Sequence, residues 1–118
     1  MIKGIGIDLV ELDRIEKLLE RNDRFLKRVL TNKEIELYQQ LPTKKRKIEF
    51  VAGRYAAKEA FSKAAGTGIG KLSFQDMEVL SAENGAPIIR ANGFEHANLH
   101  ISITHSETYA AAQAVIEE

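Results

Sequence analysis

Residues 50–70, FVAGRYAAKEAFSKAAGTGIG, combine a run of small residues with a closing glycine loop. At 100° per residue they predict a helix with one stripe of small and apolar side chains that packs on a core. That stripe consists of Phe50, Gly53, Ala57, Phe61 and Ala64. The opposite side carries Glu59 and Lys63 at i, i+4, about 6 Å apart along the axis, with Ala52 and Ala56 beside them. Because alanines leave room next to the charged pair, we expect this side to form one wall of a binding site.

Composition indicates a single globular domain. The 118 residues suit one domain over 1–118, and an apolar share of 44% argues against disorder. The chain has no cysteine, which excludes disulfides, thiolate zinc sites and a cysteine nucleophile. Residues 1–14 lack the apolar region of a signal peptide, and no apolar run approaches the about 18 residues of a membrane span. We therefore expect a cytoplasmic protein that does not enter a membrane.

A net charge of zero conceals two halves of opposite sign. Residues 1–70 hold 15 Lys/Arg and 10 Asp/Glu, a balance of +5, whereas residues 71–118 hold 2 and 7, a balance of −5. A basic half commonly faces phosphate or an acidic partner. A solvated helix surface is the alternative.

The hydrophobic periods predict an α+β fold in which helices of the first half pack on a small antiparallel sheet. A strand is predicted over 2–10, and its two faces carry Ile5, Ile7 and Leu9, and Gly4, Gly6 and Asp8. Helices are predicted over 12–30 with a break at Asn22-Asp23, from a capping box at Thr31 to about Pro42, and over 44–65. Further strands are predicted over 76–82, 87–91, 100–104 and 109–116, and the first two form a hairpin at Asn84-Gly85.

Two carboxylates stand out as a candidate magnesium site. Gly4 and Gly6 precede Asp8 on one strand face, so a bulky object can lie close to that surface. Taken singly, Asp8 can cap the next helix and Glu59 can be an ordinary partner of Lys63. Taken together, two carboxylates without histidine or cysteine suit Mg²⁺, which completes its coordination with water and phosphate oxygens. Lys63 would meet the same phosphate as a point charge.

Four motifs carry a resemblance to the 4′-phosphopantetheinyl transferases, and it covers essentially the whole chain. The motifs are Gly6-Ile7-Asp8, Phe50-x-x-Gly53-Arg54-x-Ala56-x-Lys58-Glu59-Ala60-x-x-Lys63-Ala64, Gly66-Thr67-Gly68-Ile69-Gly70 and Ser102-Ile103-Thr104-His105. Members of that family move the phosphopantetheine arm of coenzyme A to a serine of a carrier protein and release adenosine 3′,5′-bisphosphate. The nucleophile then belongs to the partner, and this chain indeed has no G-x-S-x-G elbow.

The resemblance implies roles for three charged residues. Asp8 and Glu59 match the family's magnesium ligands, and Lys63 matches a position near the pyrophosphate. Glu59, or a water that it holds, is the candidate base for the serine proton. Glu59 and Lys63 are therefore the expected catalytic residues.

The resemblance also implies a binding site for coenzyme A. The matching residues are Arg54, Lys58, Lys63, Gly66, Gly68, Asn84, Gly85, Pro87 and His105. Arg54 and Lys58 match positions near the phosphates, and His105 matches one near the 3′-phosphate ribose. The glycine loop lines the cleft, and the turn from Asn84 to Pro87 lies beside the adenine, with Ala86 where a lysine is common.

Each of these assignments has a structural alternative when the residues are taken alone. Lys58 can be a surface charge, and His105 a surface histidine at a strand end. Residues 66–70 can be a helix stop followed by a turn. They are not the dinucleotide fingerprint, because they follow a helix instead of opening one after a strand.

A basic stripe offers the signal for a protein partner. Its members, at 3-4-3-4 spacing, are Arg14, Lys17, Arg21, Arg24 and Arg28. Acyl carrier proteins present an acidic helix next to their modified serine, and a basic helix would dock it. The family's docking positions are matched by Arg14, Arg21, Arg24 and Phe25. A solvated helix face is the alternative.

The resemblance further implies a homotrimer with its active sites at subunit boundaries. Two other functions are alternatives: a nucleic-acid-binding module and a non-catalytic module that binds coenzyme A. Nucleic-acid binding would require more Lys/Arg along residues 71–118, which carry a balance of −5. Coenzyme A binding alone gives no reason for Asp8 and Glu59 to occur together with Lys63. We expect a transferase that binds no nucleic acid.

Overall fold

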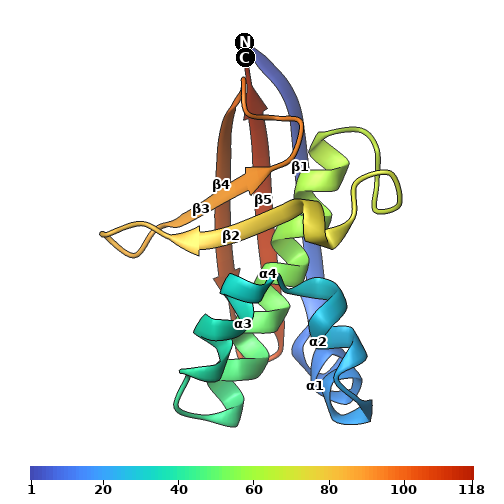
Figure 1. Cartoon of the computed structure of the whole chain (residues 1–118), viewed down its shortest axis with the longest axis vertical. Coiled ribbons are helices and arrows are strands. Elements are labelled where there is room, and N and C mark those ends of the chain that lie inside the picture. Colours follow the sequence, from blue (N-terminus) through green and yellow to red (C-terminus); the bar gives the residue numbers. More distant parts are fainter.

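The computed structural model describes all 118 residues and has an α+β fold, as predicted (Figure 1). The elements are β1 (Ile2–Glu11), α1 (Leu12–Arg21), α2 (Arg24–Val29), α3 (Asn32–Gln39), α4 (Lys44–Ala64), the 3-10 turn η1 (Phe74–Asp76), β2 (Met77–Ser81), β3 (Pro87–Ala91), β4 (Asn98–His105) and β5 (Tyr109–Glu117). The antiparallel strands divide into a three-stranded sheet of order β1-β5-β4 and a separate hairpin of β2 and β3. This division into two sheets was not predicted.

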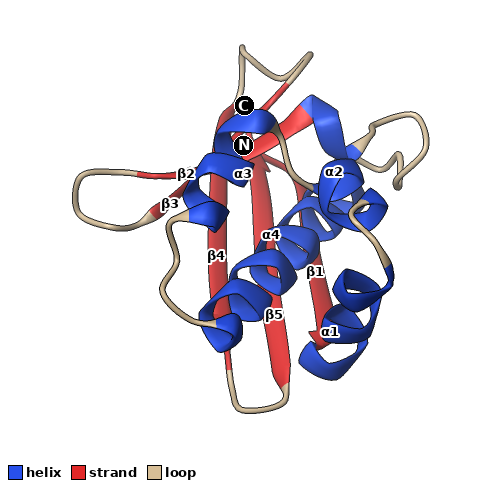
Figure 2. Ribbon diagram, turned by 60° about the horizontal axis from the view of Figure 1, so that its bottom comes forward, coloured by secondary structure: helices blue, strands red, loops and turns tan.

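Helix α4 lies across one face of the three-stranded sheet, and α1, α2 and α3 gather at one end of the molecule (Figures 1 and 2). The β2–β3 hairpin crosses in front of β4 and β5 and projects beyond them (Figure 1). The core fills the space between α4, the sheet and these smaller elements, and it includes Val51, Phe61, Met77 and Val79, all fully buried. No helix is both long enough and apolar enough to cross a membrane.

Local sequence signals place the element ends close to where they are observed. The predicted break at Asn22 separates α1 from α2, with Asn22 in an extended conformation. The predicted capping box opens α3, because Thr31 Oγ1 accepts from the Glu34 amide at 3.4 Å and Glu34 Oε1 accepts from the Thr31 amide at 2.8 Å. Helix α4 ends where predicted, and Gly66 beyond it has φ +78°.

The glycine face of β1 packs directly against the backbone of α4. A Cβ atom added at Gly4 would lie 1.9 Å from the carbonyl oxygen of Ala64, and one added at Gly6 would lie 1.9 Å from that of Ala60. Both separations are far below van der Waals contact. The bulky object expected beside these glycines is therefore α4 itself.

The expected open space beside Glu59 is a prediction that the structure corrects. Ala52 and Ala56 are fully buried in the core. Alanine at these positions allows close packing of α4 on the protein, and the apolar stripe predicted for α4 is only part of a buried surface that extends around most of the helix. On that side of the helix, Lys63 is exposed and Glu59 is half-buried.

The opposite face of β1 is apolar and uncovered. Ile5, Ile7 and Leu9 are 62%, 65% and 64% exposed, because the alternation of the strand turns them away from α4. Tyr109 on the neighbouring strand β5 is 44% exposed. A row of large apolar side chains on an uncovered sheet face is typical of an interaction surface.

The contact between β1 and α4 predicts a strong effect of one methyl group. Gly6→Ala should lower the free energy of unfolding by about 3 kcal/mol, because the strand must move away from α4. Chemical denaturation measures this loss. Gly53→Ala is the matched control, since its Cβ meets only the Cγ2 atom of Ile103 at 3.1 Å and alanine favours the helix. Equal stability of the two variants would contradict the close approach.

Candidate active site

Asp8 and Lys63 are joined across β1 and α4. Lys63 Nζ donates to Asp8 Oδ1 at 3.1 Å and to the carbonyl oxygen of Ile7 at 3.1 Å. Glu59 precedes Lys63 by one turn of α4, so the two side chains lie on the same side of the helix. Because Gly6 holds the strand against Ala60, the backbone itself places Asp8 beside this part of α4.

The charges around Glu59 show that the carboxylates interact. Burial raises the pKa of Glu59 most, and the charge of Asp8 raises it further. The cations Lys63, Arg28 and Arg14 oppose this shift in pKa. Glu59 therefore lies within electrostatic reach of a second carboxylate and of cationic side chains on α1, α2 and α4.

The donor set suits a hard divalent cation better than a softer metal. No group of three or more His, Cys, Asp or Glu side chains is clustered anywhere in the chain. A site of two carboxylates leaves most coordination positions to water and to a phosphate ligand, as Mg²⁺ prefers. Burial raises the pKa of Glu59 and the charge of Asp8 raises it further, and a bound cation relieves charge repulsion of this kind.

A second polar group forms a cavity of about 360 Å³ on another side of α4. It contains four of the predicted residues for coenzyme A, and its lining consists of Arg46, Glu49, Phe50, Gly53, Arg54, Ser81, Gly85, Pro87, Ile103 and His105. The structure thus brings Arg54, Gly85, Pro87 and His105 together from α4, the hairpin and the end of β4. Asn84 lies at the hairpin tip, where its Oδ1 accepts from the Ala86 amide at 3.0 Å.

Arg54 is a cation whose hydrogen-bonding capacity is incompletely used. Its guanidinium stacks 3.9 Å above the ring centre of Phe50, and one terminal nitrogen donates to the carbonyl oxygen of Val79 at 3.4 Å. Its Nε is buried and has no partner. Burial lowers the pKa of Arg54, and the charge of Glu34 partly opposes that effect. An incoming anionic group would satisfy such a cation.

Sequence reasoning missed Arg46 and Glu49 in this cavity. Glu49, whose side chain is 7% exposed, lies between two side chains: Arg46 donates to its Oε1 at 2.9 Å, and His105 Nδ1 lies 3.5 Å from its Oε2. The available signal was helical spacing, because Arg46, Glu49, Phe50 and Gly53 follow i, i+3, i+4, i+7.

The two polar groups lie at opposite edges of the three-stranded sheet. Asp8 belongs to β1 and His105 ends β4, and these are the outer strands on either side of β5. Gly66 and Gly68 follow the end of α4 near Lys63, where the amide of Gly68 donates to the carbonyl oxygen of Ser62 at 3.2 Å. Within one chain the acidic pair and the cationic cavity are therefore separate.

The structure corrects the assignment of Lys58 to coenzyme A. Lys58 is fully buried, and its Nζ donates to Glu34 Oε1 and the carbonyl oxygen of Val29, both at 2.6 Å, and to the carbonyl oxygen of Phe74 at 3.2 Å. All three protons of the ammonium are thereby used, so Lys58 has no donor left for a phosphate. Burial lowers the pKa of Lys58, and the Glu34 carboxylate opposes that shift.

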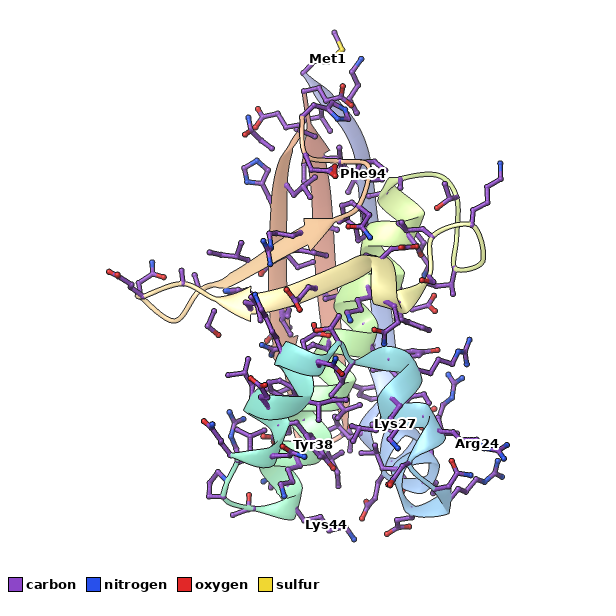
Figure 3. The ribbon with its side chains drawn as sticks, viewed as in Figure 1. Met1, Arg24, Lys27, Tyr38, Lys44 and Phe94 are labelled. Atoms are coloured by element: carbon purple, nitrogen blue, oxygen red, sulfur yellow. The ribbon has the colours of Figure 1, made fainter.

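The predicted docking residues lie on α1 and α2. Arg14, Arg21 and Arg24 are exposed, and Figure 3 shows Arg24 directed away from the body of the molecule. Phe25 is half-buried against Tyr55, with ring centres 5.8 Å apart. The break between α1 and α2 interrupts the predicted stripe, so the basic side chains are divided between two short helices.

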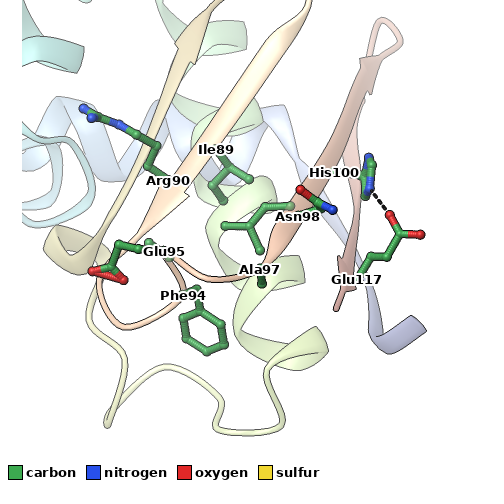
Figure 4. A pocket seen from close by; sticks show the side chains of 10 residues that line it. Ile89, Arg90, Phe94, Glu95, Ala97, Asn98, His100 and Glu117 are labelled. Carbon is green, nitrogen blue, oxygen red and sulfur yellow. Dashed lines mark hydrogen bonds and ion pairs between the residues drawn. The ribbon is translucent and has the colours of Figure 1, made fainter. Parts of the chain in front are cut away.

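A larger cavity, of about 470 Å³, lies between β3 and β4 (Figure 4). Its wall includes Phe94, Leu99 and the pair His100–Glu117, whose facing atoms are 3.1 Å apart. None of the predicted site residues lines it. Volume alone therefore does not locate the chemistry of this chain.

Comparison with known proteins supports the resemblance over the full length of the chain. The family model of the 4′-phosphopantetheinyl transferase superfamily matches residues 4–114. A holo-(acyl-carrier-protein) synthase from Oceanobacillus iheyensis is 52% identical over 117 residues, which cover 99% of this chain and 98% of the relative. The crystal structure of a holo-(acyl-carrier-protein) synthase from Bacillus anthracis str. Ames in complex with CoA (3′,5′-ADP) matches with a TM-score of 0.90 and 50% identity, covering 99% and 97% of the two chains. The corresponding synthase from Helicobacter pylori, in complex with coenzyme A, matches with a TM-score of 0.84 and 38% identity, covering 96% and 99%.

The raised pKa of Glu59 predicts a stability gain on neutralisation. The folded chain binds this proton more tightly than the unfolded chain, so at neutral pH the ionised carboxylate destabilises the fold. Glu59→Gln should therefore raise the Tm at pH 7 in the presence of a chelator. The gain in Tm should shrink as the pH falls through the raised pKa of Glu59. The folded wild type then carries a neutral carboxyl group at this position, as the variant carries a neutral amide.

Circular dichroism melts between pH 7 and pH 4 measure this dependence. Glu36→Gln, at an exposed position of α3, is the control and should show no such gain. A lower Tm for Glu59→Gln at pH 7 would contradict the electrostatic account.

Proposed function

Because the chain belongs to the 4′-phosphopantetheinyl transferase superfamily, we propose that it acts as a holo-(acyl-carrier-protein) synthase. It transfers the 4′-phosphopantetheine group of coenzyme A to a serine of apo acyl carrier protein and releases adenosine 3′,5′-bisphosphate. The observation that carries this conclusion is the identity of 52% to such a synthase across 99% of the chain. The holo carrier protein produced would serve fatty acid biosynthesis.

The reaction needs a proton acceptor and cationic groups on phosphate. The serine oxygen forms a bond to the phosphorus that carries pantetheine, and the bond from that phosphorus to the bridging oxygen of the pyrophosphate breaks. We assign Glu59 as the group that takes the serine proton, directly or through water, because it is a half-buried carboxylate one turn of α4 from Lys63. Lys63 lies beside Asp8 and can transfer its ammonium contact to a phosphate oxygen.

We further propose that Asp8 and Glu59 hold Mg²⁺. The support is the pair of carboxylates itself: burial raises the pKa of Glu59 most, and the charge of Asp8 adds to that shift. When bound, the ion supplies positive charge against the pyrophosphate and its leaving group. The repulsion between the two side chains predisposes them to bind a cation instead of closing on each other.

The cationic cavity is the proposed site for the nucleotide end of coenzyme A. Arg46 and Arg54 supply positive charge, His105 supplies ring nitrogens for hydrogen bonds, and Phe50 and Pro87 supply apolar surface for a base. The related structure from Bacillus anthracis str. Ames contains CoA (3′,5′-ADP), a ligand with an adenine and two phosphate positions. Gly85, also in the lining, adds no side chain that would narrow the cavity. Asn84 at the hairpin tip, and Gly66 and Gly68 beyond α4, remain proposed contacts.

A homotrimer would unite the acidic pair of one copy with the cationic cavity of the next. Two features support this proposal. The acidic pair and the cavity lie at opposite edges of the sheet, and the uncovered face of β1 offers Ile5, Ile7 and Leu9 as an interface. Association would bury a sheet face that is otherwise exposed to water.

The exposed arginines of α1 and α2 are the proposed docking surface for the carrier protein. Arg14, Arg21 and Arg24 would face the acidic helix beside its serine, and Phe25 would add an apolar contact. Arg14 and Arg28 act on the charge of Glu59, so this surface borders the acidic pair. Attraction between this basic surface and an acidic helix would speed the encounter of the two proteins and orient the carrier protein.

The catalytic assignment predicts that Asp8→Ala and Glu59→Ala each lower turnover at least 100-fold, as expected when one strong electrostatic group is removed from a transition state. Mass spectrometry of apo acyl carrier protein, after incubation with coenzyme A and Mg²⁺, measures the gain of one phosphopantetheine group. Glu36→Ala should retain wild-type turnover. Turnover by either alanine variant at the wild-type rate would contradict the assignment, and a wild-type chain that modifies no carrier protein would refute the function.

The assembly proposal predicts that Ile7→Glu gives single chains and loses turnover. Light scattering should give the mass of three chains for the wild type and of one chain for the variant. Ile88→Glu, at a 48% exposed isoleucine on β3, is the matched control and should remain a trimer. A wild type that is active as a single chain would contradict a shared site.

A further inference from the structure

Helix α2 is too short to be stable through its own hydrogen bonds. It has six residues, and isolated helices of this length do not persist in water. Asp23 at its N-cap makes no side-chain cap bond. The order of α2 must therefore come from contacts with other parts of the chain.

The carbonyl groups at the end of α2 are satisfied by two side chains from distant segments. A helix leaves its last four carbonyls without partners inside the helix. In α2 the side-chain amide of Gln75, in η1, donates to the carbonyl oxygens of Lys27, Arg28 and Leu30 at 2.9, 3.3 and 2.8 Å. The side-chain nitrogen of Gln75 has two protons for these three carbonyl oxygens, and its contact with the Arg28 carbonyl is the longest.

Lys58 completes the set from the opposite side. Its ammonium donates to the carbonyl oxygen of Val29 at 2.6 Å, and the carbonyl of Leu26 accepts the amide of Leu30 at 2.9 Å. Every carbonyl from residue 26 to residue 30 therefore has a donor. Gln75 and Lys58 together fasten the end of α2 to η1 and α4.

The groups that hold α2 are themselves fixed. Lys58 is fully buried and paired with Glu34 at 2.6 Å, a separation at which both charges stabilise each other. Gln75 belongs to η1, which a capping box between Ser73 and Asp76 stabilises; the Ser73 amide donates to Asp76 Oδ2 at 3.0 Å. The end of α2 is thus attached to a buried ion pair and to a capped turn.

Helix α2 carries part of the proposed docking surface and lies next to the acidic pair. Arg24 is exposed, and Phe25 packs on Tyr55, which precedes Glu59 by one turn of α4. Arg28 stands over the ring of Phe74, 5.3 Å from its centre. The position of α2 therefore sets where a docked partner lies relative to Glu59.

We propose that Gln75, acting with Lys58, is a positioning residue for recognition of the carrier protein. It keeps α2 ordered before the partner arrives, so that binding does not have to order this segment. The inference rests on the proposed function, in which α2 faces the carrier protein. Because ordering a segment on binding weakens association, loss of the Gln75 contacts raises the KM for the carrier protein. The KM for coenzyme A and kcat do not change, because the acidic pair and the cationic cavity stay intact.

The test compares Gln75→Leu with the wild type in two measurements on the full chain. Hydrogen exchange of the amides of residues 27–30 is measured without carrier protein, and the KM values for apo acyl carrier protein and coenzyme A are measured in steady state. Loss of these hydrogen bonds should speed that exchange about tenfold and raise the KM for the carrier protein about fivefold to tenfold. Gln40→Leu, at an exposed glutamine after α3 that makes no side-chain bond, should change neither quantity.

Two results for Gln75→Leu would overturn the proposal. A higher KM with unchanged exchange would mean that Gln75 contacts the carrier protein directly. Faster exchange with an unchanged KM would mean that the order of α2 does not matter for recognition.

Arg24→Glu separates this inference from the proposed function. It should raise the KM for the carrier protein without changing exchange in α2, because it alters the surface and not the support. An unchanged KM for Arg24→Glu would place the docking surface elsewhere and overturn the inference. The transferase activity itself is judged separately, by whether the wild type modifies the carrier protein at all.

Discussion

The contact of β1 with the backbone of α4 positions both the acidic pair and the apolar face of the sheet. Gly4 and Gly6 lie so close to the carbonyl groups of Ala64 and Ala60 that no side chain fits between them. This contact places Asp8 beside Lys63 and near Glu59, so two acidic residues 51 positions apart in sequence act on one region. It also directs the alternate residues of β1 outward, which leaves an apolar sheet face without cover.

A buried ion pair organises the other side of α4. Glu34 Oε1 accepts from Lys58 and from the Thr31 amide, and its Oε2 accepts from the Val79 amide at 2.8 Å. A buried charge is tolerated only when it is paired and fully hydrogen-bonded, and this pair meets that condition. The same ammonium of Lys58 reaches α2, so a structural pair in the core connects the proposed docking surface to the helix that bears Glu59. Stability and recognition share these contacts.

The separation of the acidic pair from the cationic cavity gives a physical reason for assembly. Each chain presents carboxylates and Lys63 at the β1 edge, and arginines with His105 near the end of β4. Coenzyme A carries a pyrophosphate and a nucleotide that need both kinds of surface. A second copy that covers the face of Ile5, Ile7 and Leu9 could bring them together, and one apolar surface would then serve both stability and the site.

Local patterns in the sequence predicted most of the elements and a set of candidate residues for the chemistry. Glycines, caps and alternation predicted the helix over residues 44–65, observed over 44–64, its stop at Gly66 and the hairpin, because these are local signals that need no distant partner. The family motifs predicted Asp8, Glu59 and Lys63. Only the tertiary structure decided that Lys58 is buried, that Ala52 and Ala56 are core residues, and that Gln75 holds α2. Burial and long-range hydrogen bonds depend on which segments meet in space. An alanine or a lysine in the sequence does not show whether its position lines a binding site or is buried in the core.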